Sequence, residues 1–165
     1  NFQKNSSHHF RVDVQTVSTS SDDDVYQLIG HAYVNRITLT NTGCSYDQTA
    51  QGYVTRGADW YEITGGMQDY GYLNYGTIEL TMEISCCKYP GVSTLENYWN
   101  YNRDAMIELL NQAQRGVKGV ILNEYSEPIP STQVKIDNRI PTAKVTSLGE
   151  FWKILIPGSY TLRVR

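Results

Sequence analysis

The sequence has no long apolar run and little charge. No stretch is long and apolar enough to span a bilayer, and no signal peptide is visible at its start. Charged residues make up only 19% of the chain, and the net charge is −3. That balance gives no reason to expect nucleic acid or an acidic membrane surface as a partner. We therefore expect no nucleic-acid binding and no membrane segment in this chain.

Cysteine is also scarce, with three residues that leave an odd thiol. Cys86 and Cys87 are adjacent, and a disulfide between neighbours would be strained. We expect these two to be buried or free thiols beside the end of a strand.

What the sequence does contain is apolar and aromatic. Hydrophobic residues reach 40% of 165 residues, which is enough for one ordinary domain or two small ones with a real core. Tyrosine is abundant, with 13 residues. This mixture favours a β-rich secreted protein over a charged, helical cytosolic one.

The stretch 58–90, ADWYEITGGMQDYGYLNYGTIELTMEISCCKYP, organises the rest of the chain. Trp60, Tyr61 and Ile63 are typical of the end of a buried strand. Gly65 and Gly66 permit a sharp turn, which we expect to lead into a tyrosine-rich loop.

A second strand is predicted over residues 78–84. Alternation places Ile78, Leu80, Met82 and Ile84 on one face and Glu79, Thr81 and Glu83 on the other. A carboxylate on a rigid strand, opposite a tyrosine from a neighbouring strand, can act as a general base beside a phenolic donor. The alternative is that Glu79 and Glu83 only line the solvated face of the strand.

Two helices are predicted. Ser20 and Ser21, followed by three aspartates, are typical of a helix start rather than a calcium loop, and an apolar spacing follows over Val25, Leu28, Ile29 and Ala32. Residues 1–19 and 35–57 are expected to be irregular. The second helix begins at the capping box Ser93-Thr94-Leu95-Glu96 and ends at Gly116. Its core-facing stripe is expected to be Leu95, Trp99, Met106, Leu110 and Ala113, with ligand stacking as the alternative for Trp99.

After Gly116 the apolar spacing changes from helical to alternating. Strands are predicted over 117–122, 132–136, 151–156 and 160–164, with turns at Glu127-Pro128, Ile140-Pro141 and Pro157-Gly158. Short, regularly spaced strands favour a small antiparallel sandwich. We place a domain boundary here, with residues 1–115 in one domain and residues 116–165 in the other.

The motifs WY-x-x-x-GGMQDY-x-Y and IELT-x-EISCCKYP resemble the last third of the catalytic domain of zinc metallocarboxypeptidases. The likeness is to the carboxypeptidase N/E group, of carboxypeptidase D type, and it continues through YWNYNRDAMIELL and RGVKGVI. GEFWKILIPGSYTL resembles the transthyretin-like domain of that group. The resemblance implies part of a mixed α/β catalytic domain with helices on both faces of its sheet, followed by a truncated transthyretin-like β-sandwich.

The resemblance also implies residue roles. Glu83 falls at the position of the family's general base, which takes a proton from a zinc-activated water and passes it to the leaving amine. Tyr61 matches a mobile tyrosine that hydrogen-bonds the substrate, and Gln68 matches a residue at the base of the pocket for the last side chain. A glutamine there goes with C-terminal Arg or Lys. Glu79 and Asp69 are assigned to support.

Several positions depart from the family pattern. The His-x-x-Glu motif and the later histidine that bind zinc are not present, and His8, His9 and His31 lie in unrelated sequence. The family's asparagine-arginine segment for the substrate carboxylate is also missing. Arg56 replaces an asparagine and is expected to put a bulky cation near the pocket. Thr77 stands where the group has the cysteine that pairs with one near Cys44, so that disulfide is not expected.

Two functions remain open at this point. In the first, the chain is the C-terminal part of a secreted zinc carboxypeptidase that acts on peptide or protein C-termini ending in Arg or Lys, and it is inactive alone. In the second, it is a binding or structural module derived from a carboxypeptidase. The combination of Glu83, Tyr61 and Gln68 favours the first.

Overall fold

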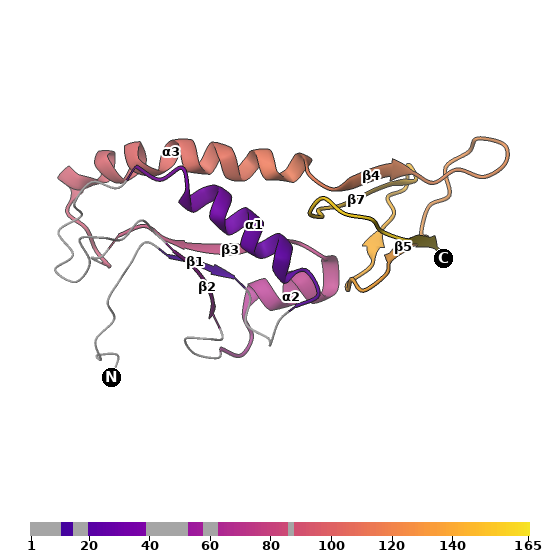
Figure 1. Cartoon of the computed structure of the whole chain (residues 1–165), viewed down its shortest axis with the longest axis horizontal. Coiled ribbons are helices and arrows are strands. Elements are labelled where there is room, and N and C mark those ends of the chain that lie inside the picture. Colours follow the sequence, from indigo (N-terminus) through magenta and orange to yellow (C-terminus); the bar gives the residue numbers. More distant parts are fainter. Residues whose placement is uncertain (1–10, 15–19, 39–52, 58–62, 86–87) are drawn as a thin grey trace.

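The computed structural model describes residues 11–14, 20–38, 53–57, 63–85 and 88–165. The molecule is elongated (Figure 1). Helices and a three-stranded sheet occupy one half, and the strands that follow the long helix α3 occupy the other half. The sequence predicted this order, with helices and a sheet first and short strands afterwards.

The sheet of the first half is mixed, as expected. It consists of β1 (Arg11–Val14), β2 (Tyr53–Arg56) and β3 (Leu80–Glu83), in the order β2-β1-β3. β1 runs parallel to β2 and antiparallel to β3. The prediction of irregular structure over 1–19 and 35–57 was therefore wrong at β1 and β2. Strands of four residues are too short to show a clear period, and pairing with distant segments decides their structure.

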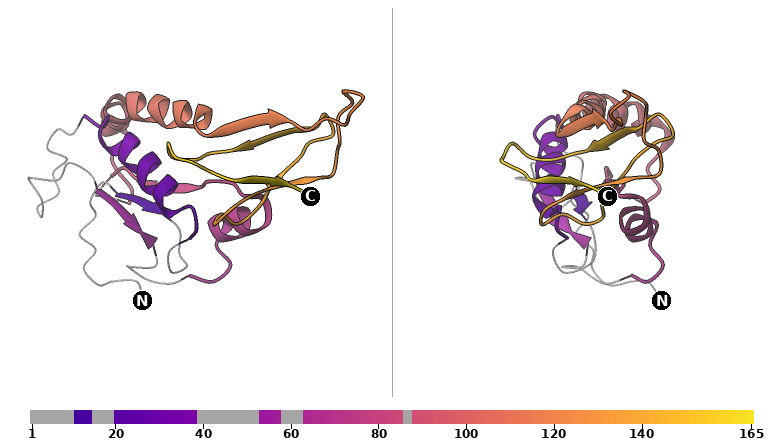
Figure 2. Two further views of the ribbon diagram at one scale, coloured as in Figure 1. Left: turned by 45° about the vertical axis from the view of Figure 1, so that its right-hand side comes forward. Right: turned by 90° about the vertical axis from the view of Figure 1, so that its right-hand side faces the viewer.

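Helices α1 (Asp23–Val34) and α3 (Leu95–Asn111) pack against this sheet through an apolar cluster. Tyr33, Val34 and Ala105 are buried at its centre, and the sheet contributes Val54, Leu80 and Met82. Figures 1 and 2 show the two helices side by side above the strands. A Cβ at Gly30 would lie 2.8 Å from Val54 Cγ1, so this glycine permits the close approach of α1 to β2.

The prediction for α1 was correct in its extent and partly wrong in its details. Val25 and Ile29 are buried, as predicted, but the buried face also includes Tyr26, Gly30 and Tyr33, while Leu28 and Ala32 are only half-buried. Asp22 is the N-cap residue, and no side chain caps the helix. The acidic residues at the helix start bind cations instead, as described below.

α3 was predicted correctly as a helix but not in the way it begins or packs. A 3₁₀ turn (Val92–Thr94) precedes it, its N-cap is Thr94, and the capping box at Ser93 does not form. Of the predicted stripe only Met106 packs on the core. The other members are exposed, and the fully buried residues are Asn102 and Ala105. Asn102 accepts a hydrogen bond from the Tyr33 hydroxyl (2.7 Å), and burial raises the pKa of Tyr33 to about 12.

The segment expected to be a tyrosine-rich loop is a helix, α2 (Met67–Tyr75). It begins after Gly66 and ends at Gly76, which has a left-handed conformation (φ 72°). The Gly76 N–H donates to the Tyr72 carbonyl, which caps the last turn. The expected hinge is present at Gly65, whose φ is 77°. The prediction failed because Gly65 and Gly66 were taken to lead into a loop, whereas Gly66 directly precedes the helix.

The C-terminal half contains two small antiparallel sheets. β4 (Val117–Val120) pairs with β7 (Glu150–Lys153), and β5 (Gln133–Ile136) lies between β6 (Ala143–Lys144) and β8 (Leu162–Val164). The four predicted strands are confirmed in shorter form, and β6 was missed. Val134, Ala143, Val145 and Phe151 form a common buried cluster between the sheets.

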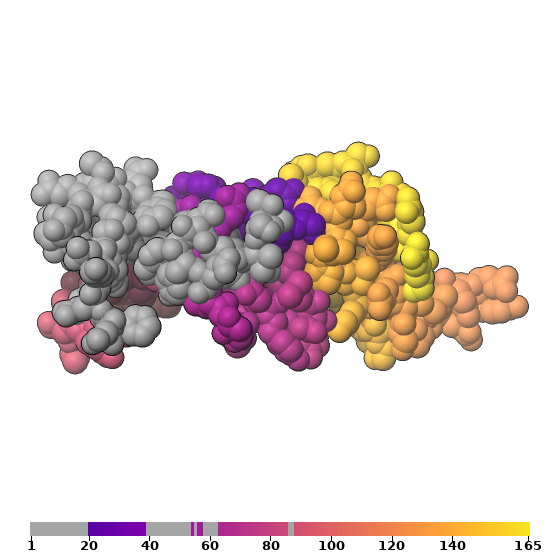
Figure 3. All heavy atoms as spheres, turned by 90° about the horizontal axis from the view of Figure 1, so that it is seen from below, coloured from indigo at the N-terminus to yellow at the C-terminus, as the bar shows by residue number. Residues whose placement is uncertain are grey.

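The halves are connected along the chain and also touch in space. Along the chain, a 3₁₀ turn (Gln112–Gln114) extends α3, and the chain enters β4 through Gly116, whose φ is 95°. In the space-filling view the C-terminal strands lie directly against the start of α1 and against α2 (Figure 3). None of the described helices has the length and apolar character needed to cross a bilayer.

Candidate functional site

The structure brings Gln68 and Glu83, two of the three predicted site residues, to one face of β3. Thr81 and Glu83 are two positions apart on this strand, so their side chains point to the same face. Gln68 reaches that face from α2, where its Nε2 donates to Thr81 Oγ1 at 2.7 Å. The apolar residues Leu80 and Met82 face the helices on the other side. Gln68 and Glu83 therefore border a common polar surface.

The orientation of the Gln68 amide follows from its hydrogen bond. Its N–H group is directed at Thr81, so its carbonyl oxygen points elsewhere as an acceptor. Both Gln68 and Glu83 are half-buried and can be reached by solvent. An acceptor and a carboxylate on one accessible surface form an arrangement that can bind a cation and accept a proton.

Tyr61, the third predicted residue, and Trp60 beside it lie outside the described residues. Ile63 is described, and it is 44% exposed in an irregular segment. The prediction that it ends a buried strand was wrong. The strand of this region is β2, and it ends seven residues earlier in the sequence at Arg56.

Arg56 does not approach Glu83. It forms a bidentate pair with Asp23 at the start of α1, with Nε–Oδ1 and Nη2–Oδ2 distances of 2.7 and 2.6 Å. The strand register separates Arg56 from Glu83 by about 10 Å along the strands and about 10 Å across them. The expected cation is thus bound to the first turn of α1, away from the candidate base.

Glu79, which was assigned to support, lies beside α2. Thr77 Oγ1 donates to Glu79 Oε1 at 3.0 Å. A Cβ at Gly71 would overlap that carboxylate oxygen, so Glu79 lies directly against α2. The carboxylate is therefore in contact with the helix that bears Gln68.

The described residues do not fit a zinc site. Within these ranges no three His, Cys, Asp or Glu side chains gather closely enough to hold a metal ion. His31 is exposed in the last turn of α1, while His8 and His9 lie outside the described residues. The part of the chain that the structure describes thus supplies a candidate base but no metal ligand set.

A second polar site lies where the two halves meet, and sequence reasoning missed it. Asp22 is fully buried (0% exposed). Its Oδ2 accepts from Lys153 Nζ of β7 (2.5 Å) and from the Tyr72 hydroxyl of α2 (3.0 Å), and its Oδ1 accepts from Arg139 Nη1 (3.2 Å). Three separate segments therefore converge on one carboxylate.

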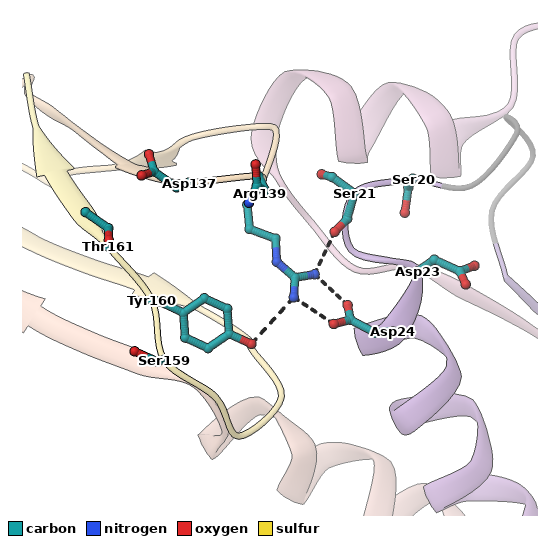
Figure 4. Close-up of a pocket in the computed structure, with 10 residues that line it drawn as sticks. Ser20, Ser21, Asp23, Asp24, Asp137, Arg139, Ser159, Tyr160 and Thr161 are labelled. Atoms are coloured by element: carbon teal, nitrogen blue, oxygen red, sulfur yellow. Dashed lines mark hydrogen bonds and ion pairs between the residues drawn. The ribbon is translucent and has the colours of Figure 1, made fainter.

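Arg139 completes this cluster, which we call the Asp22 cluster (Asp22, Asp24, Tyr72, Arg139 and Lys153). Its guanidinium donates to Asp24 through Nη1 and Nη2, with Nη1–Oδ1 and Nη2–Oδ2 distances of 2.5 and 2.7 Å (Figure 4). The hydrogen bond from Arg139 lowers the pKa of Asp24, and burial raises the pKa of Tyr72. Two aspartates face one lysine and one arginine, so the charges of the cluster balance.

The Asp22 cluster borders an open pocket of about 500 Å³. Figure 4 shows Arg139 reaching across it from the C-terminal half to Ser21 and Asp24, with Tyr160 on its other side. The guanidinium lies 5.7 Å from the centre of the Tyr160 ring. Arg139 thus forms part of the pocket wall and also joins the C-terminal half to the start of α1.

A sequence signal for the cluster existed. Phe151 and Lys153 are two positions apart in β7, so alternation puts them on the same buried face. A lysine on a buried face needs a carboxylate partner. The run of aspartates at 22–24 was the available partner, but it was interpreted only as a helix start.

Comparison with known proteins gives consistent matches. A family model described as zinc carboxypeptidase matches residues 2–105. Carboxypeptidase D of Drosophila melanogaster is 37% identical over 146 residues, 88% of this chain and 10% of that protein. Carboxypeptidase M of Mus musculus is 36% identical over 151 residues (89% and 34%), and carboxypeptidase D of Homo sapiens 35% over 156 residues (89% and 11%). The chain thus spans about a third or less of these relatives.

Proposed function

The chain belongs to the zinc carboxypeptidase family, and we propose that it forms the C-terminal part of an enzyme that removes Arg or Lys from the C-termini of peptides or proteins. The observation that carries this proposal is the shared surface of Gln68 and Glu83. The relatives are carboxypeptidases by name, which supports peptide hydrolysis as the reaction.

In this proposal Glu83 is the general base. Its carboxylate accepts a proton from the attacking water and passes it to the leaving amine. Glu83 is the last residue of β3, and the pairing of that strand with β1 holds its backbone in one place. Tyr61 is assigned as a further substrate-binding residue from the sequence motif alone.

Gln68 gives the proposed preference for a basic C-terminal residue. A guanidinium or ammonium group that leaves water needs hydrogen-bond acceptors. The Gln68 carbonyl oxygen is such an acceptor, because the Thr81 hydroxyl engages the N–H side of the amide. A neutral acceptor suits a shallow, half-exposed site, where a cationic side chain keeps part of its hydration.

The finer assignment of parts belongs to the same proposal. Residues 1–115 form part of the catalytic domain, and residues 116–165 form a transthyretin-like sandwich. Two antiparallel sheets around a shared apolar cluster support that assignment of the second part. Among the described residues no group of side chains could hold zinc, and the sequence lacks the family's His-x-x-Glu motif, so in this proposal zinc is bound outside the described residues and the isolated chain is inactive. A secreted location is proposed from composition.

The test compares the 165-residue chain with the whole polypeptide that its transcript encodes, called the full-length protein below. Hydrolysis of a peptide ending in Arg is measured with zinc content. We expect activity only in the full-length protein, and its Glu83→Gln variant should lose at least about a hundredfold in kcat with unchanged zinc content. Glu79→Gln is the matched control and should keep activity within about threefold. Equal losses in both variants would remove Glu83 as the base.

The alternative is a non-catalytic module that binds through its C-terminal strands. Exposed apolar side chains on β4 and β7, such as Val120 and Trp152, are the observation in its favour. A full-length protein that neither binds zinc nor hydrolyses C-terminal Arg or Lys would favour this alternative.

A further inference from the structure

The helix that carries Gln68 is attached to the rest of the molecule through few side chains. In α2 only Gly71 and Tyr72 are buried, while Met67, Tyr70, Leu73 and Tyr75 are all more than half exposed. A nine-residue helix without an extensive apolar face depends on its tertiary contacts. Tyr72 is therefore the main anchor of α2.

Gln68 and Tyr72 are four positions apart, so they lie one turn from each other on the same side of α2. The Tyr72 ring packs on Tyr26, with ring centres 5.8 Å apart, and against Ile78 and Leu80. A rotation of the helix that moves the Tyr72 ring would move Gln68 as well. The position of Gln68 beside Thr81 thus depends on how Tyr72 is fixed.

The C-terminal half fixes the outer end of Tyr72. Its hydroxyl lies 3.0 Å from Asp22 Oδ2 and 2.5 Å from the Ile140 carbonyl oxygen. Lys153 Nζ binds the same Asp22 oxygen and lies 6.0 Å from the centre of the Tyr72 ring. Two residues from the C-terminal strands and their connections therefore determine where the phenol sits.

Further contacts follow the same helix to its end. A Cβ at Gly76, the residue that caps α2, would lie 3.3 Å from Pro141 Cγ. Lys144 Nζ lies 4.6 Å from the centre of the Tyr75 ring, within the range of a cation–π interaction. Residues 140–144 thus run along the last turn of α2, and the helix is held on this side by the C-terminal half.

We propose that the C-terminal half positions α2, and that Lys153 and Arg139 are positioning residues for Gln68, acting through Asp22 and the Tyr72 hydroxyl. This inference rests on the proposed substrate-binding role of Gln68. It gives the C-terminal half a part in specificity. The C-terminal strands and their connections hold α2 in the position in which Gln68 faces the basic C-terminal residue of the substrate.

The test uses Tyr72→Phe in the full-length protein. The variant keeps the ring and loses only the hydroxyl that contacts Asp22 and Ile140. We expect KM for a peptide ending in Arg to rise about two- to tenfold, the size of one lost hydrogen bond, with kcat little changed. Hydrogen exchange of the α2 amides is measured on the same sample and should become faster.

Tyr125→Phe is the matched control. Tyr125 is 75% exposed in the connection between β4 and β5, so this variant loses the same hydroxyl from the C-terminal half outside the Asp22 cluster. It should leave both KM and α2 exchange unchanged. If Tyr72→Phe leaves α2 exchange unchanged, the positioning role is wrong. If exchange rises while KM is unchanged, the link to Gln68 is wrong. An inactive full-length wild type would refute the proposed function instead, and the exchange measurement would still decide whether the C-terminal half holds α2.

Discussion

The two halves of the molecule are held together in different ways. The C-terminal half encloses its own apolar cluster, in which Val134 and Phe151 are almost fully buried. The first half buries one face of its sheet under α1 and α3, yet it leaves Trp99 and Leu110 of α3 mostly exposed. Its helix α2 is attached through Tyr72, whose ring packs on Tyr26 and whose hydroxyl meets the charged Asp22 cluster. Apolar packing thus organises the C-terminal strands from within, whereas charges fix the first half at its boundary with them.

This difference predicts that the largest loss of stability will come from the junction. Asp22→Ala leaves Lys153 buried without its carboxylate and removes the acceptor of the Tyr72 hydroxyl. Breaking a buried pair in this way costs about 3–5 kcal/mol. We expect that loss in the free energy of unfolding, measured by urea denaturation followed by far-UV circular dichroism.

Asp137→Ala is the matched control for this variant. Asp137 pairs with Arg163 at 2.8 Å, but the Asp137 and Arg163 side chains are 33% and 53% exposed. Exposed pairs contribute between about 0 and 1 kcal/mol. A similar loss from Asp22→Ala and Asp137→Ala would contradict the view that the junction, rather than charge in general, holds the first half.

The same contrast between the halves explains how much of each half the sequence alone could predict. In the C-terminal half alternation identified four strands, and two of them, β5 and β7, bury one face. In α3 the helix was predicted but its buried side was not, because helical spacing repeats on several faces and the packing partner selects one.

The candidate site was predicted in part for similar reasons. Glu83 was placed correctly on the polar face of a strand, since period two leaves only two choices. The helix that carries Gln68 was taken for a loop. The Asp22 cluster depends on residues more than 100 positions apart, such as Asp22 and Lys153. Pairing over that separation leaves no local pattern, so only the buried position of the lysine pointed to it.

A smaller effect on the free energy of unfolding is expected from the pair Asp24–Arg139, and this effect depends on pH. Arg139 holds the pKa of Asp24 below its ordinary value of 3.8, so folding favours the charged carboxylate. The stabilisation is complete above the unfolded-state pKa and is lost as the pH falls through the lower pKa of the folded state. Because the Asp24 side chain is 38% exposed, screening limits the contribution to about 1 kcal/mol or less.

Asp24→Asn tests this by removing the titrating group. The variant should be slightly less stable than the wild type at pH 7, and the difference should shrink as the pH falls below 3.8 and disappear only below the lower pKa of the folded-state Asp24 carboxyl. Urea denaturation at a series of pH values measures it. A gap that stays constant from pH 7 to pH 3 would show that the charge of Asp24 does not act through Arg139.

The smallest effect is expected on the exposed side of α3, where the comparison between the halves is sharpest. Trp99 was predicted to be a core residue, but it is 53% exposed, so Trp99→Tyr, which keeps an aromatic ring at this position, removes little buried surface. Tyrosine and tryptophan also have similar helix propensities. The free energy of unfolding should therefore change by no more than about 1 kcal/mol.

Ala105→Leu on the same helix is the counterpart: Ala105 is fully buried against α1, and the larger side chain should cost about 1–3 kcal/mol by overpacking. If the tryptophan variant proves the more damaging of the two, then α3 packs through the face that its sequence suggested, and the first half is held by apolar contacts as the C-terminal half is.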